Sequence, residues 1–79
     1  MRPISTSEQV GAILSSRRKH LGMSQAKVAE SVGLSQNRLS VLESNPETLT
    51  VKQLLALLNV LGLEMSVDER VARKSKVEW

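Results

Sequence analysis

The chain has 79 residues, of which 41% are hydrophobic and only one, Trp79, is aromatic. This length predicts one small domain. Because the chain has almost no aromatic residues, its core must be aliphatic, which favours helices packed on helices. The absence of cysteine and the single histidine, His20, argue against a disulfide framework and a clustered metal site, and the net charge of +3 favours a polyanionic partner only weakly.

The first predicted helix follows a short arm that contains Pro3. Ser5 and Glu8, three residues apart, are typical of a capping box at its start, and Gly22 follows its last turn. Between them, apolar residues recur on one helix face, at Val10, Ile13, Leu14 and Leu21. We therefore expect a helix that runs from this capping box to about Leu21 and packs through that face.

Two short helices are predicted next, near Gln25–Val32 and Gln36–Ser44. Ser24 and Ser35 occupy positions where N-cap residues are favoured, and Gly33 can adopt the positive φ that ends the first of the two helices. Apolar side chains share one face of each helix. This combination is typical of a helix-turn-helix, which presents its second helix to the major groove of DNA.

A last helix, Val51–Leu61, is predicted after the break at Asn45-Pro46. Thr50 and Gln53 form a capping box at its start. The helix carries more apolar residues than one buried face requires. The surplus favours a second buried contact, most simply a dimer interface, although solitary exposed side chains would give the same pattern.

Beyond this helix, Leu63, Met65 and Val67 alternate with polar residues, a pattern typical of a half-buried strand. No other segment is expected to pair with this strand, so its natural partner is the same strand of a second chain. The expected fold class is all-α with one short C-terminal strand, a bundle of four helices whose strand pairs across a homodimer. Residues 1–67 would form the DNA-binding and dimerisation domain, and residues 68–79 a flexible C-terminal tail.

The second short helix supplies the candidate base-reading residues, because Leu39 and Leu42 must face inward. The outward positions are Ser35, Gln36, Asn37, Arg38 and Ser40. Asn and Gln amides can make bidentate hydrogen bonds to adenine, a hydroxyl can bind several base edges, and the neighbouring Val41 could contact a thymine methyl group. The alternative is a polar face that contacts only solvent.

Other charged and polar residues fall into two groups. Arg18 lies near the apolar face of the first helix, and we expect it to pair with Glu43 and so fix how the recognition helix is presented. Phosphate contacts are expected from residues at helix starts or on basic stretches, namely Gln25, Arg17, Lys19 and Lys52. No catalytic, metal-binding or cofactor-binding constellation is recognised in the sequence, so an enzyme is not expected.

One set of residues combines these features: Arg18, Gly22-Met23-Ser24-Gln25, Val28-Ala29, Gly33-Leu34-Ser35, Leu39 and Leu42-Glu43. Over roughly residues 6–62, this set resembles the Xre/Cro repressor-type DNA-binding domain. Outside the set, Asn45-Pro46, the GLEMSV segment and Val77-Glu78-Trp79 resemble the HipB-type antitoxins of HipBA-like toxin–antitoxin systems.

The resemblance implies a homodimer whose paired strands form a small intersubunit sheet and which binds a palindromic double-stranded DNA operator upstream of its own genes. It also implies that the chain neutralises a HipA-like Ser/Thr kinase toxin, with Trp79 on the tail as a toxin contact. Asn37 and Arg38 cannot be assigned to a known operator, so the operator sequence stays open. A toxin split into two chains, with a separate small kinase-binding subunit, is also compatible with the sequence.

Two other functions stay open at this point. One is a stand-alone repressor of the phage or restriction-system type, and the other is a protein-interaction adaptor that binds no DNA. The sequence has no apolar run approaching the ~18 residues of a membrane span, and its N-terminus lacks the apolar core of a signal peptide. We therefore expect a cytoplasmic protein with no membrane partner and no small-molecule ligand.

Overall fold

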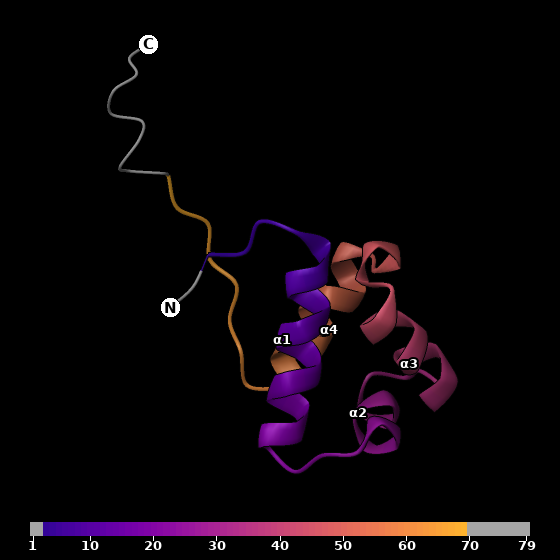
Figure 1. The fold of residues 1–79 in the computed structure, drawn as a ribbon. Coiled ribbons are helices and arrows are strands. Elements are labelled where there is room, and N and C mark those ends of the chain that lie inside the picture. Colours follow the sequence, from indigo (N-terminus) through magenta and orange to yellow (C-terminus); the bar gives the residue numbers. More distant parts are fainter. Residues whose placement is uncertain (1–2, 70–79) are drawn as a thin grey trace, which may run out of the picture.

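A computed structural model describes residues 3–69 of the chain. In this part, the elements in chain order are α1 (Ser7–His20), α2 (Gln25–Ser31), α3 (Gln36–Ser44), the 3₁₀ turn η1 (Pro46–Thr48) and α4 (Val51–Val60). α3 packs against both α1 and α2, and α2 also contacts α4. Figure 1 shows α2 and α3 on one side of α1, while the segment that follows α4 leaves the bundle on the other side.

The start of α1 differs from the sequence prediction. The capping box predicted at Ser5 and Glu8 is wrong, because Thr6 is the N-cap residue: its hydroxyl accepts the Gln9 N–H at 3.3 Å. The Gln9 side chain in turn accepts the N–H groups of both Thr6 and Ser5. Both registers satisfy the sequence pattern, but in the observed one a single side chain accepts two backbone N–H groups, those of the N-cap residue and of the residue before it.

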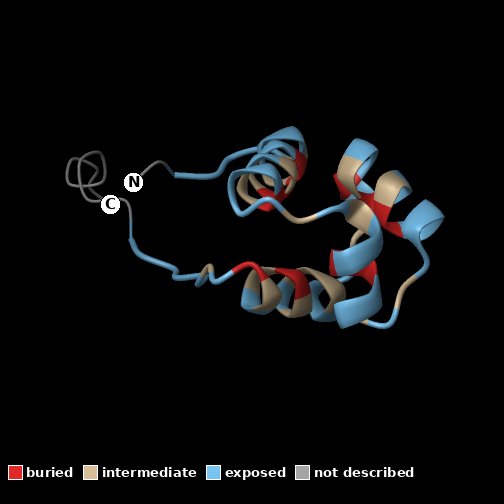
Figure 2. Cartoon of the chain, turned by 90° about the horizontal axis from the view of Figure 1, so that it is seen from below, coloured by how far each residue is buried: buried red, intermediate tan, exposed pale blue. Residues whose placement is uncertain are grey.

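The core lies where the helices face one another, as the buried positions in Figure 2 show. Fully buried aliphatic residues of the four helices, together with the C-cap residue of α4, form one cluster: Leu14, Val28, Ala29, Leu39, Leu57 and Leu61. Burial of each Leu or Val side chain contributes ~1.5–3 kcal/mol to folding. Leu21, predicted on the apolar face of the first helix, is instead 42% exposed, because α1 ends before it and Leu21 is the C-cap residue.

α1 approaches the end of α3 so closely at Gly11 that no side chain fits between them. A Cβ atom on Gly11 would lie 2.6 Å from the carbonyl oxygen of Glu43 and 2.9 Å from Cγ of Pro46. Glycine inside a helix is less favourable than alanine by ~1 kcal/mol, so a helical glycine needs a compensating contact. Here the contact seats the C-terminal end of α3 and the following turn directly on α1.

The segment after α4 carries the strand predicted at Leu63, Met65 and Val67. No strand is present among residues 3–69 of this single chain. The N–H of Leu63 donates to the carbonyl of Leu58 at 2.8 Å, and Leu63 packs partly on the core. Beyond it, Met65 is 46% exposed and Val67 is 88% exposed. A strand needs partners for its backbone groups, and the partner that the sequence predicts is a second chain. The predicted toxin contact at Trp79 lies outside the described residues.

Candidate nucleic-acid interface

The turn between α2 and α3 is fixed by its own hydrogen bonds. Gly33 adopts a φ of +75°, and the N–H groups of Gly33 and Leu34 donate to the carbonyls of Glu30 and Ala29 at 3.2 and 2.8 Å. This is the Schellman arrangement, which satisfies carbonyls left free at a helix end. The Ser35 hydroxyl then accepts the N–H of the third residue of α3 at 3.0 Å. Both predicted serine N-caps, at the starts of α2 and α3, are confirmed.

A buried polar network joins α1, α2 and α3. Arg18 Nε donates to Glu43 Oε2 at 2.9 Å and Nη2 donates to Oε1 at 3.2 Å, while the two side chains are only 10% and 8% exposed. Arg18 Nη1 donates to the carbonyl of Met23 at 3.1 Å, and Gln25 Nε2 donates to Glu43 Oε1 at 3.0 Å. The structure thus contains the ion pair expected between Arg18 and Glu43. The pair ties the last turn of α3 to α1, and the hydrogen bond from Gln25 ties it to the first residue of α2.

The outward face of α3 carries the residues predicted to bind bases. Ser35, Gln36, Asn37 and Arg38 are exposed and Ser40 is half-buried, whereas Leu39 and Leu42 are buried beneath them. Within the described residues, Arg38 belongs to no ion pair. The structure therefore brings these predicted residues together at the N-terminal half of one helix, where amides, hydroxyls and a guanidinium are free to meet the edges of base pairs.

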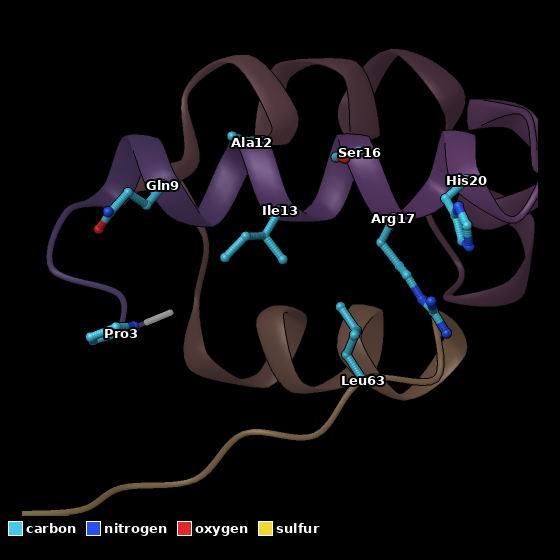
Figure 3. Close-up of a pocket in the computed structure, with 8 residues that line it drawn as sticks. All are labelled: Pro3, Gln9, Ala12, Ile13, Ser16, Arg17, His20 and Leu63. Atoms are coloured by element: carbon cyan, nitrogen blue, oxygen red, sulfur yellow. The ribbon is translucent and has the colours of Figure 1, made fainter. Parts of the chain in front are cut away.

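The candidate phosphate contacts do not all lie near this face. Lys19 and Lys52 are exposed, whereas the Gln25 side chain is bound to Glu43. Arg17 lines an open hollow of about 530 Å³ between α1, the arm and Leu63, and its side chain extends from α1 towards the end of α4 (Figure 3). There Arg17 Nε donates to the carbonyl of Leu61 at 2.9 Å, a helix-end contact that sequence reasoning missed. Nothing in the sequence around Arg17 indicates that its side chain would bind the carbonyl of Leu61.

The chain belongs to the helix-turn-helix family HTH_3, whose model matches residues 14–67. No curated protein sequence matches the chain significantly. Among solved structures, the fold is similar to a chain of a HipA-HipB-O2-O3 complex, with 25% sequence identity over 87% of this chain and 97% of that chain and a TM-score of 0.81. A chain of a HipB-O1-O2 complex shares 25% identity over 87% of this chain and 100% of its own length, with a TM-score of 0.80.

A third similar chain, described as MDT Protein, shares 25% identity over 87% of this chain and 97% of its own, with a TM-score of 0.81. Together, the family match and the likeness to HipB confirm the resemblance that the sequence indicates.

Over the described residues, no helix is long and apolar enough to cross a membrane. In the same part of the chain, no three His, Cys, Asp or Glu side chains gather as a metal site would require.

Proposed function

We propose that this chain is an antitoxin and transcriptional autorepressor, which binds a palindromic operator as a homodimer and neutralises a HipA-like Ser/Thr kinase toxin. The observation that carries the proposal is the outward polar face of α3, held in place by the buried network of Arg18, Glu43 and Gln25. The likeness to HipB, which occurs in a complex with HipA, supports the toxin partner.

In this proposal, α3 enters the major groove. Gln36 and Asn37 use their amides to read adenine, and Ser40 and Arg38 contact neighbouring base edges. Lys19 and Lys52, together with the N-terminal residues of α2, bind phosphate and set the register without reading sequence. Because one recognition helix reads only a few base pairs, useful specificity requires two copies placed about 34 Å apart, one helical turn of DNA.

The two copies would pair through the segment after α4. Among residues 3–69, Met65 and Val67 are exposed apolar residues, and α4 adds Val51 and Leu55, which are 70% and 48% exposed. Paired strands would satisfy the backbone groups of residues 63–67 and bury the apolar side of the segment.

Met65→Lys should weaken this dimer, because it places a charge on the apolar side of the proposed strand. Ser66→Lys is the matched control: it adds the same charge on the opposite side and should leave the dimer nearly intact. Sedimentation analysis measures both effects. A wild-type monomer at concentrations on the order of tens of micromolar, or equal losses in the two variants, would contradict dimerisation through this segment.

Removal of residues 70–79 should weaken toxin binding, while folding and operator binding stay near the wild-type level. The core cluster lies between Val10 and Leu63, so the truncation removes none of its members. A large aromatic side chain is a suitable anchor for a partner's apolar pocket, so Trp79→Ala should reproduce much of the loss. Ser75→Ala is the control. A truncated chain that neutralises its cognate toxin as well as the wild type would exclude the tail as a toxin contact.

Co-expression tests the proposal as a whole. The chain is produced together with the HipA-like kinase that the proposal expects to be encoded next to it. A reporter gene stands under the chain's own upstream region, and both growth and reporter output are measured. The proposal predicts repression of the reporter and rescue of growth. Repression without rescue would indicate a stand-alone repressor, and rescue without repression would indicate a protein-interaction module that binds no DNA.

A further inference from the structure

One exposed residue of α3 does not fit a purely polar recognition surface. Val41 is 42% exposed, and in the described part of the chain it is the only large hydrophobic residue of α3 that is so exposed. Single exposed aliphatic residues are common on protein surfaces and need no explanation by themselves. The position of this one on the helix is what matters.

Helix geometry places Val41 at the centre of the outward face. Successive residues of an α-helix are turned by about 100°, so residues four apart point in nearly the same direction. Leu39 and Leu42 point into the core and Glu43 points towards Arg18. Val41 therefore points away from the core, in nearly the same direction as Asn37, which lies one turn earlier in the helix. The half-buried Ser40 lies beside them.

An isopropyl group on this face has one apolar counterpart in the major groove. Thymine carries a C5-methyl group there, whereas cytosine has no methyl group on C5 and presents its N4 amino group as a donor on the same edge. A donor left facing an apolar group loses its hydrogen bond to water, so an aliphatic side chain selects against it. We propose that Val41 contacts the methyl group of one thymine in each half-site and makes that base a specificity determinant. The inference rests on the proposed function, because it requires α3 to lie in the major groove.

The experiment begins with duplexes enriched by the wild-type chain from a random-sequence pool. Each thymine of the enriched half-site is then replaced singly by deoxyuridine, which removes the methyl group and leaves every hydrogen-bonding atom in place. For the wild type, one replacement should weaken binding about fourfold, the effect expected for one buried CH₂ group. In Val41→Ala, that replacement should change affinity less than about 1.5-fold, because the contact is already reduced.

Ile4→Ala is the control, since it shortens an exposed aliphatic side chain of the N-terminal arm, outside both α3 and the proposed dimer surface, and should keep the fourfold sensitivity. Absence of any methyl-sensitive thymine, or a sensitivity that persists in Val41→Ala, would overturn the assignment while leaving DNA binding established. Loss of helical structure in Val41→Ala, followed by circular dichroism, would overturn the outward position of the side chain. Failure to enrich any duplex would overturn both this inference and the proposed function.

Discussion

Glu43→Ala should lower the free energy of unfolding by about 3–5 kcal/mol, the usual cost of leaving one partner of a buried ion pair uncompensated. The Arg18 guanidinium would keep only the Met23 carbonyl as a hydrogen-bond acceptor, and the Gln25 amide would lose its acceptor as well. For a domain of this size, each kcal/mol corresponds to about 4–8 °C in Tm, so the melting curve should shift by more than about 12 °C. Circular dichroism during heating measures the shift.

Glu47→Ala is the control, because Glu47 lies exposed in η1 only four residues further along the chain. Its melting curve should stay close to that of the wild type. Replacing both partners, with Arg18→Met and Glu43→Leu together, should recover much of the lost stability, since a well-packed apolar pair can substitute for a buried ion pair. Overlapping melting curves for Glu43→Ala and Glu47→Ala would show that the ion pair does not hold α3 in place.

Asn37→Ala should weaken binding to the cognate operator by about 1–3 kcal/mol for each half-site, the discrimination that one bidentate contact supplies. Binding to random duplex of the same length should change much less, because contacts outside the base edges carry non-specific affinity. Fluorescence anisotropy with labelled duplexes measures both affinities. The difference between them, and not the loss on the operator alone, identifies Asn37 as a base-reading residue.

Lys52→Ala provides the opposite pattern. Lys52 is exposed on the first turn of α4, so its loss should weaken specific and non-specific binding alike and lower the salt dependence by about one ion per protomer. If Asn37→Ala instead weakens the two duplexes equally, Asn37 contacts no base.

Much of the framework was predictable because the signals are local. Ser24, Ser35 and Thr50 each precede a helix and accept an N–H group within the next three residues, so a short sequence window contains both partners. The ion pair between Arg18 and Glu43 spans 25 positions, yet its partners follow from which helix faces must be apolar. Hydrophobic periodicity therefore predicted both the helices and the orientation of α3.

Contacts that depend on the exact approach of two elements were not predictable. Arg17 binds the end of α4, and Gln25 joins the network at Glu43, because of where the helices cross and not because of a sequence pattern. Gly11 carried an unused signal: a glycine inside a helix marks a close approach, here to the end of α3. The predicted strand is a different case, since the partner for residues 63–67 would belong to another chain.

The most direct test of sequence-specific recognition by α3 is a titration of the region upstream of the chain's own gene, where the proposed function places a palindromic operator. The comparison is a scrambled duplex of equal composition at the same salt concentration. The account predicts two protomers per palindrome and an affinity at least about 10³-fold higher than for the scrambled duplex. Equal affinity for the two duplexes, or saturation at one protomer per palindrome, would contradict it.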